Sequence, residues 1–113
     1  MTKYILVGVD GSDASMNAVR FATRMAKSME VGIYAAHVIN APRWGEYFSD
    51  LADKLTEEAK IILDKVKAIV EEAGVTVKTT IIEGIPDKAL SAIANEDKAI
   101  YMIVVGSTGR GRA

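Results

Sequence analysis

Hydrophobic and polar positions along the chain follow two kinds of pattern. Continuous apolar runs over residues 4–9, 31–39 and 100–105 predict strands buried on both faces, which is typical of a parallel sheet covered by helices. Residues 75–82 alternate in part, which indicates a strand at the edge of a sheet. Between these runs, apolar residues recur every three or four positions over residues 13–29, 51–73 and 87–94, as in amphipathic helices. The chain is therefore predicted to alternate strands with helices.

Residues that commonly begin or end helices occur at the boundaries of these segments. Ser12 is a suitable N-cap for the first helix, Gly74 a suitable C-terminal stop for the second, and Pro86 and Asp87 suit the first turn of the third. The apolar stripe of the first helix is predicted at Met16, Val19, Ala22, Ala26 and Met29, with Phe21 and Met25 alongside, and its methionines are interpreted as core residues. The stripe of the second helix is predicted at Leu51, Leu55, Ala59, Ile62, Val66, Ile69 and Ala73.

Residues 43–50 are expected to form a connection between the second strand and the second helix. This segment gathers Trp44, Tyr47 and Phe48. Such aromatic side chains can form a lid over a ligand, a surface for a partner or a plug for the core, and the sequence leaves these alternatives open.

Right-handed crossovers between these strands predict an α/β fold with an open, doubly wound parallel sheet. If the winding reverses at the first strand, the strand order is 3-2-1-4, and the loops at Asp10–Ser12 and Gly106–Gly109 meet at the reversal point. Ligands bind such sheets at this point, beyond the carboxyl ends of the strands. We therefore expect the binding site there.

Composition limits the possible functions. The 113 residues are expected to form a single domain, and a formal net charge of −1 gives no field that would attract nucleic acid or an anionic membrane. The run at residues 4–9 is too short to span a bilayer. The absence of cysteine fits a cytoplasmic location, and a single histidine, His37, allows neither a histidine metal cluster nor a Ser-His-Asp triad. We interpret His37 as a hydrogen-bonded residue near a strand end.

The last residues offer a candidate anion-binding loop. Glycines at 106, 109 and 111 would let backbone N–H groups approach a phosphate, although a solvated tail has the same composition. The loop is not a Walker A motif, because Arg112 and Ala113 stand where Lys and Ser or Thr are needed.

Three motifs resemble the universal stress proteins, small α/β domains of which one branch binds ATP. They are Val7-Gly-Val-Asp-Gly-Ser12, with glycine at position 8 where many members have proline, the pair His37-Val38, and Ile103-Val-Val-Gly-Ser-Thr-Gly109. The resemblance implies that Asp10 contacts the ribose, that Val9 and the backbone of Val38 frame the adenine, and that Gly106 and Gly109 bring amides to ribose and phosphates. Ser12, Val105 and Thr108 complete the implied nucleotide-binding residues, and Mg²⁺ would accompany the ATP.

The chain departs from the nucleotide-binding branch at its end. That branch carries G-x2-G-x9-G-[ST], and only its first half is present here, at Gly106 and Gly109. The final helix and the fifth strand of the family are expected to be absent. The resemblance therefore implies an ATP-binding stress-response or regulatory protein with at most slow hydrolysis. The alternatives are an interaction module of the same fold that binds no nucleotide and, less favoured, an enzyme acting on a phosphorylated small molecule.

Without a fifth strand, residues 101–105 would form an apolar sheet edge that carries neither charge nor proline. Exposed edges of this kind pair with other chains. We therefore expect a homodimer or larger assembly, most simply with the fourth strand paired to itself across a two-fold axis.

Overall fold

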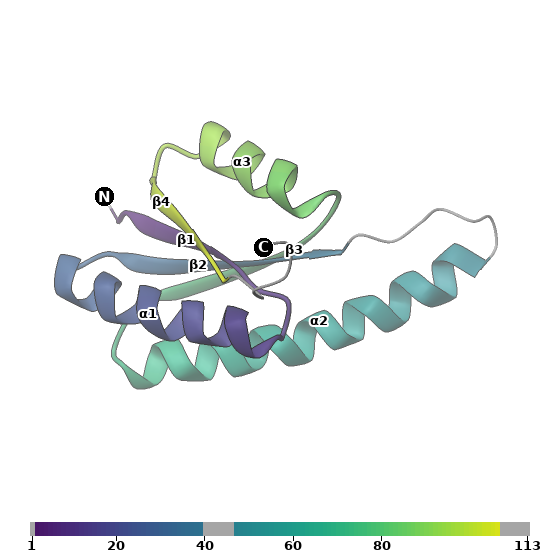
Figure 1. The fold of residues 1–113 in the computed structure, drawn as a ribbon, viewed down its shortest axis with the longest axis horizontal. Helices are drawn as coiled ribbons and strands as arrows, with labels where there is room; N and C mark the ends of the chain where they lie inside the picture. The colour runs from purple at the N-terminus through teal and green to yellow at the C-terminus, as the bar shows by residue number, and fades with distance from the viewer. Residues whose placement is uncertain (1, 40–46, 107–113) are drawn as a thin grey trace, which may run out of the picture.

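The computed structural model describes residues 2–39 and 47–106, and for residues 47–52 the backbone alone. Strands and helices alternate as expected (Figure 1). In chain order they are β1 (Tyr4–Gly8), α1 (Asp13–Met29), β2 (Gly32–Ile39), α2 (Tyr47–Glu72), β3 (Val77–Glu83), α3 (Pro86–Glu96) and β4 (Ile100–Val105).

The described strands form one parallel sheet in the order β3-β2-β1-β4, which confirms the predicted fold class and the reversal of winding at β1. Gly8, the last residue of β1, lies between Ala36 of β2 and Val105 of β4. β3 occupies an edge, as its partial alternation predicts. The carboxyl ends of β1 and β4 therefore lie side by side.

The predicted helix ends are also found. Ser12 is the N-cap of α1, and its hydroxyl accepts the N–H of Ser15. Gly74 has a φ of +79° just after α2, a conformation that favours glycine, and Pro86 occupies the first turn of α3.

The start of α2 differs from the prediction. The helix begins at Tyr47, so Tyr47 and Phe48 belong to its first turn rather than to a connection, while Trp44 lies outside the described residues. The apolar stripe is less informative there because it begins only at Leu51.

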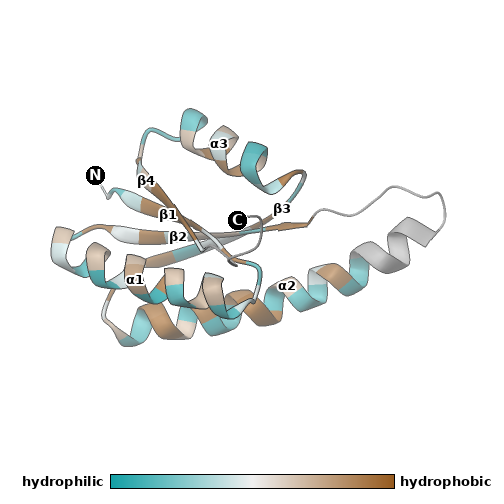
Figure 2. Cartoon of the chain, viewed as in Figure 1, coloured by the Kyte–Doolittle hydropathy of each residue, from teal (hydrophilic) through white to brown (hydrophobic). Residues whose placement is uncertain are grey.

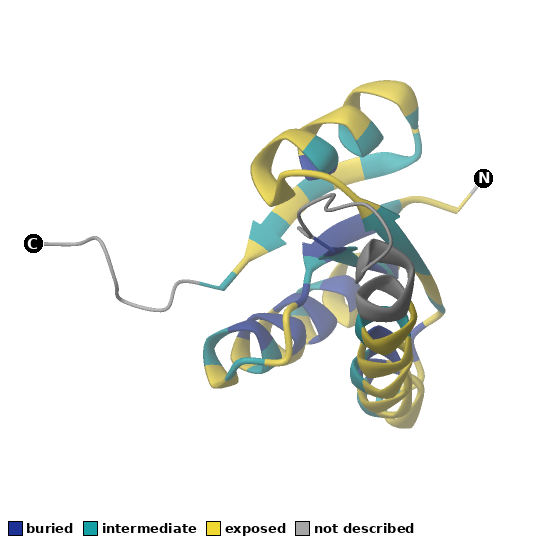
Figure 3. Ribbon diagram, turned by 90° about the vertical axis from the view of Figure 1, so that its right-hand side faces the viewer, coloured by how far each residue is buried: buried dark blue, intermediate teal, exposed yellow. Residues whose placement is uncertain are grey.

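The two faces of the sheet are covered unequally (Figures 1 and 3). Helices α1 and α2 cover one face and enclose the larger core, which includes Ile5, Val7, Val19 and Ile33. The other face is covered by α3, where the buried cluster consists of Leu6, Ala36 and Leu90. Figure 2 shows the apolar strands between these helix layers.

The predicted helix stripes need correction at several positions. In α1, Met16 and Met25 pack against the core as expected, but Phe21 and Met29 are exposed, and the hydroxyl-bearing Thr23 is buried instead. Thr23 is accommodated because its hydroxyl donates to the carbonyl of Val19 at 2.7 Å. In α2, the buried positions include Leu63 and Val70, which the predicted stripe omits. The spacing of apolar residues defines a broad apolar sector of each helix, and only tertiary packing decides which residues of that sector are most buried.

The prediction that β4 is buried on both faces is wrong. Its residues alternate between half-buried and exposed, with Tyr101 and Val105 each 59% exposed and Ile103 40% exposed. Met102 and Val104 pack against the larger core, whereas Ile103 lies on the side of Leu6, its partner in β1, where α3 leaves β4 uncovered. An uninterrupted apolar run therefore does not prove burial when the strand lies at an edge.

None of the helices in the described part of the chain is sufficiently long and apolar to cross a membrane.

Truncating two nearby aliphatic side chains tests which face of α2 packs against the core. Leu63 is 5% exposed and Ile61 is 58% exposed. We expect Leu63→Ala to lower the free energy of unfolding by about 2–5 kcal/mol because it leaves a cavity. Ile61→Ala, the matched control, should change it by no more than about 0.5 kcal/mol. Chemical denaturation measures both values, and equal losses would contradict this orientation of the helix.

Candidate functional site

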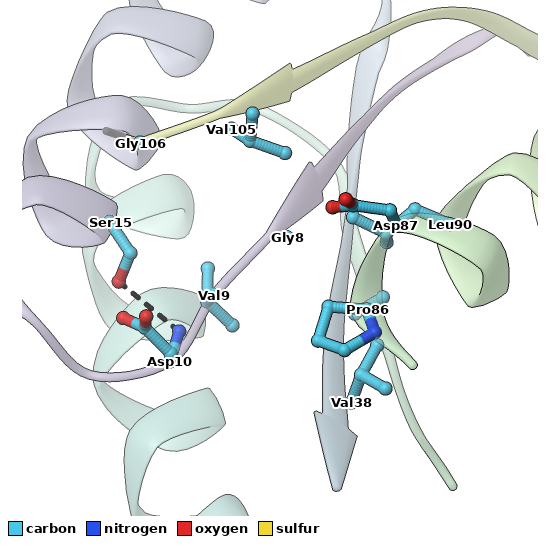
Figure 4. A pocket seen from close by; sticks show the side chains of 11 residues that line it. Gly8, Val9, Asp10, Ser15, Val38, Pro86, Asp87, Leu90, Val105 and Gly106 are labelled. Atoms are coloured by element: carbon cyan, nitrogen blue, oxygen red, sulfur yellow. Dashed lines mark hydrogen bonds between the residues drawn. The ribbon is translucent and has the colours of Figure 1, made fainter. Parts of the chain in front are cut away.

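A pocket of about 200 Å³ lies at the carboxyl ends of the central strands (Figure 4). Its walls come from β1 and the loop after it, β2, the end of β4, and the first turns of α1 and α3. The lining residues are Gly8, Val9, Asp10, Ser15, Ala36, Val38, Pro86, Asp87, Leu90, Val105 and Gly106. The pocket therefore lies where the reversal of winding predicts a binding site.

The pocket has ends of different character (Figure 4). Val38, Pro86 and Leu90 provide an apolar surface on the side of β2 and α3, where the carboxylate of Asp87 also lies. Asp10 and Ser15 lie on the other side, at the start of α1, close to the end of β4. Such a site suits a ligand with a flat apolar part joined to a polar part.

The loop after β1 is held by hydrogen bonds among Asp10, Ser12 and Ser15. The Asp10 carboxylate accepts the N–H of Ser12 at 2.9 Å, and the Ser15 hydroxyl accepts the N–H of Asp10 at 3.2 Å. That hydroxyl in turn donates to the Ser12 carbonyl at 3.2 Å. Gly11 between them has a φ of +84°, which other residues rarely adopt. The position of the Asp10 side chain is therefore set by the turn that begins α1.

Several contacts act on the ionisation of Asp10. Partial burial raises the pKa of its carboxyl, but the hydroxyl and backbone N–H of Ser12, the Ser15 hydroxyl and the nearby His37 together hold that pKa below its ordinary value. The side chain is therefore an anion at neutral pH, able to accept further hydrogen bonds from a ligand.

Gly106 is required by packing against α1. A Cβ at this position would meet the carbonyl oxygen of Ala14 and would lie 2.8 Å from the backbone nitrogen of Ser15. The end of β4 thus touches the first turn of α1. The sequence suggested glycine here for access to a ligand, and the structure adds close backbone contact as a reason.

The hydrogen-bond ladder between β1 and β2 ends within the pocket. The N–H of Val9 donates to the carbonyl of Ala36 at 2.9 Å. The next bond of a regular parallel ladder would join the N–H of Val38 to the carbonyl of Val9. Instead, Nδ1 of His37 lies 2.9 Å from that carbonyl. This agrees with the interpretation of His37 as a hydrogen-bonded residue near a strand end.

The structure brings together most of the residues that the sequence proposed for nucleotide binding. Val9, Asp10, Val38, Val105 and Gly106 all line the pocket. The side chain of Val9 belongs to the larger core, and Ser12 contributes by capping α1 and orienting Asp10. Thr108 and Gly109 lie outside the described residues.

Sequence reasoning missed the remaining wall of the pocket, and in particular Ser15, Pro86 and Asp87. The sequence did contain a signal for Pro86 and Asp87. A helix that follows a parallel strand begins at the carboxyl edge of the sheet, so the first turn of α3 had to lie near the strand ends. Ser15 gave no comparable signal, since it reads as a residue of the helix.

Among the described residues, no group of three or more His, Cys, Asp or Glu side chains could hold a metal ion.

Comparison with known proteins gives consistent results. A sequence profile of the universal stress protein family matches residues 1–113. The universal stress protein MJ0531 of Methanocaldococcus jannaschii is 34% identical over 96% of this chain and 66% of its own length. MJ0577 of the same organism is 40% identical over 58% of this chain and 40% of its own length, so this chain spans less than two thirds of the curated relatives that it matches first.

Solved structures share the fold. A universal stress protein from Lactobacillus plantarum has a TM-score of 0.86 and 27% identity, covering 98% of this chain and 83% of its own. A universal stress protein in complex with cAMP has a TM-score of 0.79 and 25% identity, covering 97% of this chain and 80% of its own.

The lowered pKa of Asp10 makes a prediction about acid stability. A carboxyl whose pKa is lower in the folded state stabilises the fold above its unfolded pKa of about 3.9 and loses this contribution as the pH falls through the folded value. Asp10→Asn keeps an acceptor oxygen but cannot ionise. We expect the variant to be less stable than the wild type at pH 7, and the difference to shrink as the pH falls below about 4.

Thermal unfolding of both proteins from pH 7 to pH 2.5 measures this difference. Asp64→Asn, on the exposed face of α2, is the control and should show no comparable change with pH. A constant difference between Asp10→Asn and the wild type at every pH would contradict the lowered pKa.

Proposed function

The chain belongs to the universal stress protein family, and from this premise we propose that it binds an adenine nucleotide, ATP, in the pocket between β1, β4 and α3. The observation that carries the proposal is that the apolar surface of Val38, Pro86 and Leu90 lies in the same pocket as the polar start of α1, with Asp10 and Ser15. The family member in complex with cAMP supports an adenine nucleotide as the ligand class.

The apolar end suits the base. Val38, Pro86 and Leu90 offer a nonpolar wall on which a flat ring can lie. Backbone groups of alternate residues in β2 point toward β1, as the bonds from Gly32 to Lys3 and from Val9 to Ala36 show. By this alternation the N–H and carbonyl of Val38 point the same way, beyond the last pair of the two strands at Gly8 and Ala36. A donor and an acceptor are thereby presented to the edge of the base.

The polar end suits the sugar and phosphates. The Asp10 carboxylate is an acceptor for ribose hydroxyls. The first turn of α1, with Gly106 against it, presents backbone N–H groups and the positive end of the helix dipole, both of which favour an anion. Thr108 and Gly109 would extend this cradle toward the phosphates. Mg²⁺ would be held chiefly by the phosphates of the nucleotide, since this ion usually keeps few protein ligands.

We propose a binding or regulatory role in the stress response, in the cytoplasm, rather than catalysis. His37 follows Ile33 and Ala35 on the face of β2 that packs on the larger core, and its imidazole is not among the groups that line the pocket. Asp10 lines the pocket, but its carboxylate is held by the turn that begins α1, where it can accept hydrogen bonds from a ligand. The alternative is an interaction module that binds no nucleotide, and the following titration distinguishes the two.

Isothermal titration with ATP and Mg²⁺ tests the proposal. We expect saturable binding by the wild type, and a loss of about 10- to 100-fold in affinity for Asp10→Ala, because a hydrogen bond to a charged group contributes about 1.5–3 kcal/mol. Asp64→Ala, which removes an exposed carboxylate from α2, should bind as the wild type does. Absence of heat at millimolar ATP from a folded wild-type sample would favour the interaction module.

We further propose that the chain forms a homodimer through β4. Tyr101, Ile103 and Val105 leave an apolar surface on the α3 side of this strand, and β4 is the edge of the described sheet. A second copy can cover this surface and pair with the edge across a two-fold axis.

Size-exclusion chromatography with light scattering tests the dimer. We expect about twice the monomer mass for the wild type, and a shift toward monomer for Ile103→Lys, because charge on an exposed edge strand opposes pairing. Ile61→Lys adds the same charge to an exposed position of α2 and should leave the mass unchanged. A wild-type monomer at micromolar concentration would refute the dimer.

A further inference from the structure

The position of His37 has a consequence beyond the hydrogen bond that its own ring makes. Along β2, Ile33 and Ala35 face the larger core, so His37, two residues further, lies on the same side of the sheet. Tyr34, Ala36 and Val38 belong to the α3 side, and Val38 lines the pocket. The imidazole therefore approaches the end of β1 from the face opposite the apolar wall of the pocket.

The bond made by the ring changes the backbone of the neighbouring residue. The Val9 carbonyl is the acceptor that a regular ladder would assign to the Val38 N–H. With Nδ1 of His37 at 2.9 Å, that carbonyl is already engaged, and the ladder stops at the bond from Val9 to Ala36. Because a carbonyl oxygen can only accept, Nδ1 must carry the hydrogen.

We propose that His37 is a positioning residue that ends the β1–β2 ladder one bond early and so keeps the N–H of Val38 available to the base of the ligand. This inference rests on the proposed nucleotide binding. His37 itself does not touch the ligand, because it acts through the carbonyl of Val9. Without the imidazole donor, the Val9 carbonyl accepts the Val38 N–H, the two strands close, and the edge that faces the base is lost.

A series of substitutions separates this role from simple packing. In His37→Asn the side-chain amide can place a donor near the position of Nδ1, so the Val9 carbonyl stays engaged. His37→Leu offers similar bulk without a donor, and His37→Gln places its amide closer to the position of Nε2. All variants are first compared with the wild type by thermal unfolding, and binding is measured only on folded protein.

Amide hydrogen exchange followed by NMR gives the direct readout. We expect the Val38 amide to exchange at least about 10-fold more slowly in His37→Leu and His37→Gln than in the wild type, because a ladder bond protects it, while His37→Asn behaves as the wild type does. A mere loss of packing would speed exchange across the strand end. Unchanged or faster exchange of the Val38 amide in both variants would overturn the inference.

Ligand binding gives the second readout, with adenosine as the probe of the apolar end and ribose 5-phosphate as the probe of the polar end. His37→Leu should lose about 10-fold in affinity for adenosine, the upper range for one neutral hydrogen bond, and less than about 2-fold for ribose 5-phosphate. Equal losses for both probes, or none, would overturn the positioning role. If the wild type binds neither adenosine nor ATP while the Val38 amide responds as expected, the proposed function fails and the ladder geometry stands.

Discussion

The structure depends on the double pairing of β1. This strand bonds to β2 along one edge and to β4 along the other, and Ile5, Leu6 and Val7 are fully buried between the helix layers. Because β1 has a strand along each edge and a helix layer over each face, the chain must leave it toward β2 and return later to β4. The carboxyl ends of β1 and β4 therefore lie side by side, and the pocket forms at this end of the sheet.

The unequal helix layers explain the character of the two pocket ends. The side of α1 and α2 holds most of the buried residues, and hydrogen bonds to Ser12 and Ser15 fix the turn that carries Asp10. The side of α3 is thinner. Near the opposite end of the strands it is reinforced by Lys78, whose ammonium lies 4.6 Å from the ring of Tyr4 and 4.4 Å from that of Tyr34, and 3.9 Å from the Asp97 carboxylate. The apolar wall of the pocket thus belongs to the less deeply packed layer.

Backbone N–H and carbonyl groups are available at the pocket because a helix begins and the β1–β2 pairing ends there. The first turn of α1 has N–H groups without helical partners, and β2 extends past the end of β1. Polar main-chain atoms are thereby presented to a ligand without any special side chain. The side chains of Ser12, Ser15 and His37 act mainly by holding these ends in place.

The sequence by itself determined the order of strands and helices, the helix ends apart from the start of α2, and the strand ends that carry the site, because periodicity and capping are local properties of the chain. It indicated Asp10 and Gly106 because these residues follow predicted strands, whereas Val38 was indicated by the resemblance to the family. Only the tertiary structure decided that Leu63 rather than Ile61 is buried, that β4 has an uncovered face, and that His37 engages Val9. These outcomes depend on contacts between segments distant in sequence, such as the separation of 28 residues between His37 and Val9, which no local pattern records.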